Sequence, residues 1–239
     1  MNAIPIEREL KVLEVDYKSL KSKLKNLGAK EIFKGWIHDI YFDYPERVLY
    51  DAGIRIRVRN KNNEKIIFSF KDKWPEPEGV KRLLSNRSFI KKIVDIVSLR
   101  EIIKARTIAN IKKRLQKMKK EVLWNSYSSE ELKIKEAKEI EFVVPGFEEI
   151  SYILNVFGLQ PIAEKKKHRV SYEILTDQGK VVFDFDKYDG IPWLIEIEGP
   201  SAEVIYQRVK KLGLQNNPIK TFGSRGLFAY YGKPYMELI

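Results

Sequence analysis

Two carboxylates and an ammonium group alternate near the start of the chain. If this segment is a β-strand, Glu7, Glu9 and Lys11 point to one side, because side chains alternate between the two faces of a strand. The opposite side is mostly apolar and includes Leu10 and Val12. The charged side is therefore either a solvent-exposed face or the lining of a water-filled cavity.

The same one-sided clustering of charge recurs along later segments of the chain. The clusters are Arg55, Arg57 and Arg59; Ser69, Lys71 and Lys73; Glu139 and Glu141; Lys165, Lys167 and Arg169; Asp184 and Asp186; and Glu196 and Glu198. Arg and Lys can clamp an anion that has several phosphate oxygens, whereas clustered carboxylates can hold a hard cation such as Mg²⁺ or Mn²⁺. The two signs of charge together indicate chemistry on a phosphorylated substrate.

Eight strands are expected to carry these clusters, and every one except the second shows charge gathered on one side. The sequences Asn62-Asn63 and Asp177-Gln178-Gly179 are typical of hairpin turns. The expected strands span residues 5–13, 35–43, 53–60, 65–73, 137–144, 166–175, 180–187 and 192–199. Helices are expected at 17–27, 147–157 and 202–212, each followed or ended by a glycine.

An α+β fold built on a closed eight-stranded antiparallel β-barrel satisfies this pattern. Closure removes the sheet edges and separates an inside from an outside. If the helices cover the apolar outer side, the charged side lines a polar tunnel. Acids and bases must then pair or bind ions, because an isolated buried charge costs several kcal/mol.

The composition is that of a globular protein with a single large core. The chain has 239 residues, of which 44% are hydrophobic, and it has no cysteine. No apolar run is long enough for a membrane span or a signal peptide, so a cytoplasmic location and no membrane partner are expected. We predict one domain over residues 1–239.

The net charge of +12 is concentrated in one segment. Residues 81–120 contain 14 Lys or Arg and two acids, and apolar residues recur there every three or four positions. This pattern predicts a basic helical insertion at about 81–135, between the fourth and fifth strands. The insertion is either a lid or an oligomer contact, such as that of a homodimer, or a surface that recruits RNA or another polyanion.

An ordered set of motifs resembles the CYTH superfamily, also known as triphosphate tunnel metalloenzymes. This superfamily includes class IV adenylyl cyclases, thiamine triphosphatases and inorganic triphosphatases. The resemblance covers roughly residues 4–75 and 137–231. The motifs are Glu7-x-Glu9-x-Lys11, His38-Asp39-x-Tyr41-Phe42-Asp43, Arg55-x-Arg57, Phe70-Lys71, Lys167-x-Arg169, Asp186 and Glu196-x-Glu198.

The resemblance implies a role for each matching residue. Lys11, Glu7 and Glu9 would be catalytic, with Lys11 orienting water or protonating a leaving group. The implied triphosphate clamp consists of Lys11, Arg55, Arg57, Lys71, Lys167 and Arg169. The implied ligands of Mg²⁺ or Mn²⁺ are Glu7, Glu9, Glu196 and Glu198, with Asp186 and Glu141 as further candidates. Glu139 and Glu141 could equally pair with tunnel bases.

Three functions are compatible with these residues. We favour metal-dependent hydrolysis of tripolyphosphate or of an organic or nucleoside triphosphate bound as a small molecule inside the barrel. An adenylyl cyclase that makes cyclic AMP from ATP would use the same charges but would also need an adenine pocket. An RNA 5′-triphosphatase or a non-catalytic binder of polyphosphate or nucleotide is the third alternative.

Overall fold

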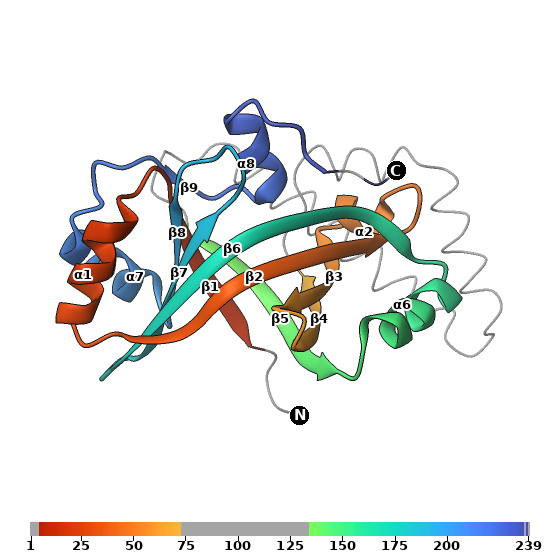
Figure 1. The fold of residues 1–239 in the computed structure, drawn as a ribbon, viewed down its shortest axis with the longest axis horizontal. Coiled ribbons are helices and arrows are strands. Elements are labelled where there is room, and N and C mark those ends of the chain that lie inside the picture. The colour runs from red at the N-terminus through yellow and green to blue at the C-terminus, as the bar shows by residue number, and fades with distance from the viewer. Residues whose placement is uncertain (1–4, 73–133, 237, 239) are drawn as a thin grey trace, which may run out of the picture.

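The computed structural model describes residues 5–72, 134–236 and 238 (Figure 1). In chain order the elements are β1 (Ile6–Val12), α1 (Tyr17–Asn26), β2 (Lys30–Asp43), α2 (Val48–Asp51), β3 (Ile54–Lys61), β4 (Lys65–Asp72), β5 (Lys135–Val144), α6 (Phe147–Val156), β6 (Gln160–Thr176), β7 (Gly179–Lys187), β8 (Leu194–Glu198), α7 (Ala202–Leu212), β9 (Ile219–Lys220) and α8 (Ser224–Tyr230). The predicted basic insertion lies outside the described residues, except at its end, where Lys135 already belongs to β5.

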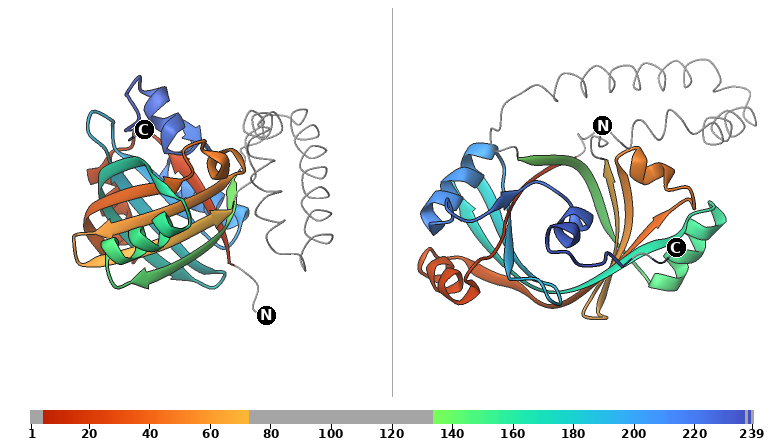
Figure 2. Two further views of the ribbon diagram at one scale, coloured as in Figure 1. Left: turned by 90° about the vertical axis from the view of Figure 1, so that its right-hand side faces the viewer. Right: turned by 90° about the horizontal axis from the view of Figure 1, so that it is seen from above.

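Eight antiparallel strands pair in a ring. Their order around it is β1, β5, β4, β3, β2, β6, β7 and β8, and β8 pairs with β1 again. The short β9 pairs with the end of β1. The right-hand view of Figure 2 looks into this ring from above. The eight antiparallel strands of the sequence prediction are confirmed.

Two strands are longer than the sequence pattern predicts. The expected strands at 35–43 and 166–175 are parts of β2 and β6, whose pairing continues as far as Lys30 opposite Glu173. The additional residues lack the alternation of apolar side chains that marks a half-buried strand. Backbone hydrogen bonds do not depend on that alternation, so the pairing runs on across polar residues.

The three predicted helices are confirmed as α1, α6 and α7. The Asp16 carboxylate accepts a hydrogen bond from the first turn of α1, and the Ser201 hydroxyl does the same for α7. Gly28, Gly158 and Gly213 follow the helices with φ of 80°, 78° and 74°, a conformation that glycine adopts without strain. None of the helices in the described ranges has the length and hydropathy of a membrane span.

Helices cover the apolar outer side of the ring. Leu10 of β1 and Phe185 of β7 are buried against Leu24 of α1 and Ile205 of α7. A second cluster packs under α6, and a third under α8. The charged residues that alternate with these apolar ones must therefore face the interior of the ring, as the strand pattern predicts.

Candidate active site

The ring encloses a cavity of about 910 Å³ with a strongly charged lining. The basic side chains along it are Lys11, Arg47, Arg55, Arg57, Arg59, Lys61, Lys65, Lys71, Lys135, Lys165, Lys167, Arg169 and Arg225. The acidic ones are Glu7, Glu9, Asp43, Glu139, Glu141, Asp184, Glu196 and Glu198. The structure brings together every residue of the predicted site except Asp186, which lies behind the wall.

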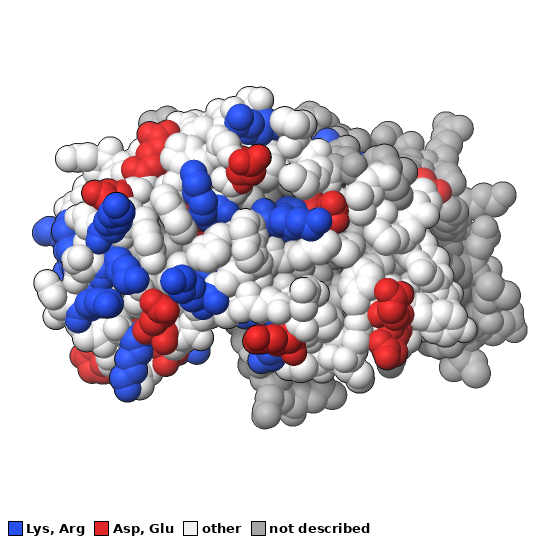
Figure 3. All heavy atoms as spheres, viewed as in Figure 1, with Lys and Arg blue, Asp and Glu red and all other residues white. Residues whose placement is uncertain are grey.

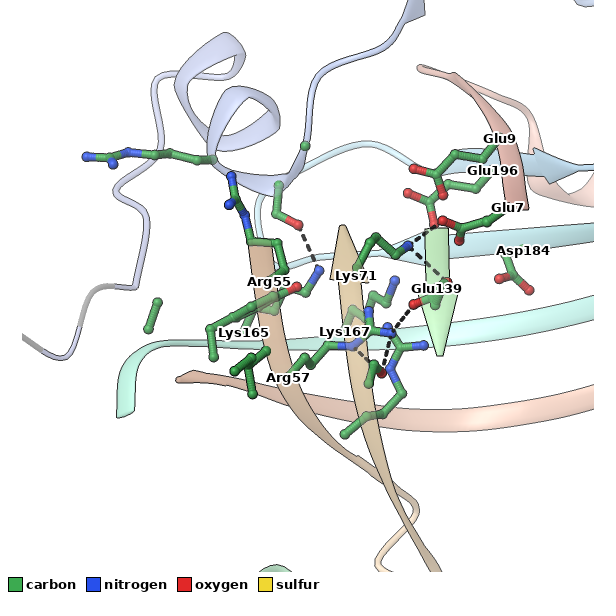
Figure 4. A pocket seen from close by; sticks show the side chains of 18 of the residues that line it. Glu7, Glu9, Arg55, Arg57, Lys71, Glu139, Lys165, Lys167, Asp184 and Glu196 are labelled. Atoms are coloured by element: carbon green, nitrogen blue, oxygen red, sulfur yellow. Dashed lines mark hydrogen bonds and ion pairs between the residues drawn. The ribbon is translucent and has the colours of Figure 1, made fainter. Parts of the chain in front are cut away.

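The two signs of charge are separated across the cavity. The basic side comes largely from β3 and β6, and the acidic side from β1, β7 and β8. Figure 4 shows the two groups, with Arg55, Arg57, Lys165 and Lys167 on one side and Glu7, Glu9, Glu196 and Asp184 on the other. On the outer face in Figure 3, by contrast, acids and bases are intermingled, mainly over the part where α1 lies. The face seen in Figure 3 therefore lacks the separation that the cavity shows.

Asp39 of β2 is the acid at the centre of the basic side. Its carboxylate is fully buried and accepts hydrogen bonds from Arg59, at 2.6 Å from Nε and 3.1 Å from Nη2. Lys165 Nζ lies 3.4 Å away and Arg57 Nε 4.0 Å away. Burial would raise the pKa of Asp39, but these three cations outweigh it and hold the pKa well below its usual value. The charged Asp39 thereby positions three cations of the cavity wall.

The sequence-based site did not include Asp39, Arg59 or Lys165. Asp39 shares its side of β2 with Ile37 and Tyr41, so a criterion that requires two charges on one side of a strand misses it. The sequence shows no pair of charges two residues apart on one side of the second strand, and this strand nevertheless contributes Asp39 to the basic side. The sequence signal that could have identified Asp39 is a single acid between two uncharged residues on the inward side of the strand.

Arg55 differs from the other cations on this side. Among the described residues, no carboxylate lies within 4.0 Å of it. Its Nη1 donates to the carbonyl oxygens of Tyr50 and Ile54, both at 2.8 Å, and its guanidinium lies 3.7 Å from the centre of the Tyr50 ring. Asp43 acts on Arg55 only from beyond ion-pair distance, so the guanidinium can still receive an anion.

Arg57 and Lys71 connect the basic side to the acids of β5. Arg57 Nη2 lies 2.8 Å from Glu141 and 3.4 Å from Glu139, and Lys71 Nζ lies 3.1 Å from Glu139. The Ser69 hydroxyl also donates to Glu141, at 2.8 Å. Both glutamates thus pair with bases in the structure, and metal binding by Glu141 stays a prediction.

Glu196 is the most strongly compensated acid of the opposite side. It lies 3.0 Å from Lys11 Nζ and 2.6 Å from Arg169 Nη2. Burial would raise the pKa of Glu196, but Lys11, Lys167 and Arg169 outweigh it and hold the pKa well below the usual value. Glu196 is therefore ionised at neutral pH.

The two glutamates of β1 are each paired with a lysine. Glu7 contacts Lys71, and Glu9 contacts Lys135 at the start of β5. Lys135 is a site residue that sequence reasoning missed, because the predicted insertion extended over it. Glu9 also lies directly opposite Glu198 in the pairing of β1 with β8. Two carboxylates thus lie at paired positions of neighbouring strands.

Glu198 has no ion-pair partner among the described residues, and the more distant Lys71 compensates its charge only in part. Within the described ranges no Lys, Arg or His lies within 4.0 Å of its carboxylate. Burial raises its pKa, and the negative charges of Glu7, Asp184 and Glu139 raise it further, to about 7. This acid lacks the positive partner that its neighbours have.

Asp186 lies beneath the cavity wall and holds two of its cations. The carboxylate is fully buried, and its two oxygens accept hydrogen bonds from Arg169 Nε and Nη2, both at 2.6 Å, and from Lys167 Nζ. Both oxygens are therefore engaged. This placement gives Asp186 a role in positioning Lys167 and Arg169. Burial, followed by the charge of Arg169, lowers the pKa of Lys167 to about 8.

The segment before and at the start of α8 forms part of the cavity wall. Lys11 Nζ donates to the carbonyl oxygen of Phe222 at 3.2 Å, and Lys165 Nζ donates to the Ser224 hydroxyl at 2.7 Å. A ligand that binds these two lysines would have to share them with this segment.

The acidic side has donors that suit a divalent cation. Carboxylates are the ligands that Mg²⁺ and Mn²⁺ prefer, and the uncompensated Glu198 opposite Glu9 is a place where a cation would relieve repulsion. In the described parts of the chain, no three Asp, Glu or His side chains are yet gathered closely enough to ligate an ion. The donor chemistry fits a metal, and Glu7, Glu9, Glu196 and Glu198 would hold it.

Comparisons with known proteins identify the family of the chain. The CYTH domain profile matches residues 4–215. The chain belongs to the CYTH domain family. Members of this family are triphosphatases and adenylyl cyclases, and they generally depend on divalent metal ions. No curated protein matches the chain.

Solved structures share this fold at low sequence identity. PH1012 from Pyrococcus horikoshii is 18% identical with a TM-score of 0.57, over 92% of this chain and 98% of its own. A "putative adenylate cyclase" from Vibrio parahaemolyticus is 12% identical with a TM-score of 0.60, over 95% and 99%. HpAC1 from Hippeastrum, described as having a dominant triphosphatase activity, is 14% identical with a TM-score of 0.52, over 95% and 97%. At these identities the likeness establishes the CYTH fold.

Replacing Asp39 by Asn tests its role as the shared counter-ion of the basic side. The substitution keeps the shape of the side chain but leaves Arg57, Arg59 and Lys165 without their acid. We expect the free energy of unfolding, measured with urea, to fall by about 3–5 kcal/mol. The control Asp177→Asn, in the exposed turn between β6 and β7, should change it by less than about 0.5 kcal/mol. Equal stability of the two variants would contradict the role of Asp39.

Replacing Glu198 by Gln tests the crowding of acids. The pKa of Glu198 is raised from its ordinary value of 4.5, so its contribution to stability is present below that value and is lost as the pH rises through about 7. Without metal, the variant should exceed the wild-type protein in stability at pH 8 and not at pH 4. Glu198 is withdrawn from water only in part, and solvent screening limits the gain to about 1 kcal/mol. Glu173→Gln on β6 is the control, and a gain that is independent of pH would exclude the explanation.

Proposed function

We propose that the protein is a divalent-metal-dependent triphosphatase that binds its substrate inside the ring, which serves as a closed triphosphate tunnel. The observation that carries this proposal is the separation of charge across one enclosed cavity. A triphosphate presents several negative oxygens to a basic wall and at the same time shares metal ions with an acidic wall. Neither a purely basic nor a purely acidic cavity could do both.

The basic wall would hold the phosphates. Arg55 is available as it stands, and the guanidinium group offers several donors in a geometry that suits phosphate. Arg57 and Lys71 would exchange their present partners Glu139 and Glu141 for phosphate oxygens. Lys11, Lys167 and Arg169 would complete the clamp from β1 and β6. The observed ion pairs keep these cations positioned and charged before the substrate arrives.

The acidic wall would hold the metal. Glu7, Glu9, Glu196 and Glu198 supply carboxylate oxygens of the kind that Mg²⁺ or Mn²⁺ binds. When bound, the ion would neutralise phosphate charge and make a water molecule more acidic. Release of Lys71, Lys135 and Lys11 from these glutamates would accompany binding.

Hydrolysis then requires positioning more than covalent participation by the protein. A water oxygen forms a bond to the terminal phosphorus, the bond from that phosphorus to the bridging oxygen breaks, and the proton of the water passes to solvent or to the leaving diphosphate. Lys11, which pairs with Glu196 on the acidic side, would orient the water or donate to the leaving oxygen. Arg55 and Arg57 would stabilise the charge on the leaving group.

A product assay tests this function. Purified protein is incubated with tripolyphosphate, ATP or thiamine triphosphate, with Mg²⁺, with Mn²⁺ or with a chelator, and the products are separated. We expect phosphate release that needs metal. Cyclic AMP with pyrophosphate would instead identify a cyclase, and no turnover of any substrate would contradict the proposal and favour an RNA 5′-triphosphatase or a binding protein.

In the same assay, Glu9→Ala or Glu198→Ala should lower metal-dependent turnover at least about a hundredfold, the loss expected when an essential charge is removed from a site of this kind. Circular dichroism checks that the fold is kept. Glu173→Ala, on β6 and away from the cavity lining, is the matched control and should retain full activity. Full activity of both site variants would contradict the assignment of the acidic wall.

A further inference from the structure

Asp43, the last residue of β2, holds the connection between β2 and β3 through its side chain. The carboxylate is buried, and both of its oxygens accept hydrogen bonds from backbone N–H groups. Oδ1 accepts from Tyr44 at 2.7 Å and from Leu49 at 3.0 Å. Oδ2 accepts from Tyr50 at 2.8 Å. One carboxylate thus fixes this connection, which contains α2, to the end of β2.

α2 depends on Asp43 because the residue at its N-cap position cannot cap it. The first N–H groups of a helix have no partners within the helix and need an acceptor from outside. Arg47 occupies the N-cap position with φ 58°, and an arginine side chain carries no acceptor. Asp43 accepts from Leu49 and Tyr50 in its place, although it lies four positions earlier in the chain. The orientation of α2 is therefore set by a buried acid of the sheet.

Tyr50 carries this constraint to the cavity. Arg55 Nη1 donates to the Tyr50 carbonyl oxygen at 2.8 Å, and the Arg55 guanidinium lies 3.7 Å from the centre of the Tyr50 ring. The N–H group of the same tyrosine donates to Asp43. A chain of contacts thus leads from Asp43 through Tyr50 to Arg55, a cation of the cavity lining. The acid can influence the orientation of Arg55 although it lies beyond ion-pair distance.

We propose that Asp43 is a positioning residue for anion binding: by fixing Tyr50, it holds the guanidinium group of Arg55 where phosphate oxygens can reach it. This inference rests on the proposed function, which makes Arg55 part of the triphosphate clamp. Asp39 and Asp186 contact their cations directly, whereas Asp43 acts through the backbone of α2. Because backbone N–H groups engage both of its oxygens, Asp43 orients a cation and is not placed to ligate a metal ion.

Binding of tripolyphosphate without metal, measured by calorimetry, tests this role independently of turnover. Asp43→Asn keeps the shape of the side chain, but an amide nitrogen cannot accept a hydrogen bond, so at least one of the three N–H groups loses its acceptor. We expect this variant to bind about tenfold more weakly than the wild-type protein, and Arg55→Ala at least about tenfold more weakly. In a protein that already carries Arg55→Ala, adding Asp43→Asn should change the affinity less than about twofold.

Two further variants separate positioning from stability. Asp16→Ala removes a carboxylate that likewise accepts backbone hydrogen bonds, from the first turn of α1, and that lies outside the cavity lining. It should be less stable in urea than the wild-type protein but bind tripolyphosphate equally well. Tyr50→Leu removes the ring beside Arg55 and keeps the backbone contacts. It should weaken binding about threefold, and only while Arg55 is present.

The outcomes distinguish the positioning role from the proposed function. Wild-type affinity of Asp43→Asn, or an equal weakening with and without Arg55, overturns the positioning role even if tripolyphosphate is hydrolysed. If Asp43→Asn does not fold, Tyr50→Leu decides by the same criterion. If the effect depends on Arg55 but no triphosphate is hydrolysed, the positioning role stands and the proposed function fails. Wild-type affinity of Arg55→Ala overturns the positioning role together with the place of Arg55 in the clamp.

Discussion

Charge compensation inside the ring is the constraint on which the rest of the structure depends. The apolar sides of the strands pack against α1, α6 and α7, so the charged sides can only point inward. Withdrawing a charge from water costs several kcal/mol unless an opposite charge replaces the water. Asp39 forms ion pairs with three cations and Asp186 with two, and both carboxylates are fully buried. These buried acids allow a basic wall to exist within a folded protein.

The places where compensation is incomplete are the places where ligands would bind. Among the described residues, Arg55 and Lys61 on the basic side have no acid within 4.0 Å, and Glu198 on the acidic side has no cation within 4.0 Å. An anion and a metal ion would each supply what is missing on one wall. Because several lysines now neutralise the metal-binding glutamates, the two ligands would favour each other's binding. A polyphosphate carrying a divalent metal has both signs of charge in one ligand.

The sequence was sufficient to predict the strands, the inward side of most of them and the ordered motif of the family. It predicted that Glu9 and Glu198 would lie in one site although they are 189 positions apart in the chain. It could not reveal Asp39 as the hub of the basic wall, because one acid among uncharged inward neighbours has no repeating pattern. It also placed Asp186 among the metal ligands, since a pattern of alternation cannot distinguish the cavity surface from the layer beneath it. The extra length of β2 and β6 depends on backbone pairing, which a pattern of side chains does not predict.

A crystal structure with a non-hydrolysable tripolyphosphate analogue and Mn²⁺ tests the central claim most directly, because the anomalous signal of manganese locates the metal independently. The account predicts phosphate oxygens in contact with Arg55, Arg57 and Lys71, and manganese beside the glutamates of β1 and β8. It also predicts that Asp39 keeps its contacts with Arg59 and Lys165 when the ligand is bound. An analogue bound outside the ring, or manganese held away from Glu9 and Glu198, would contradict it.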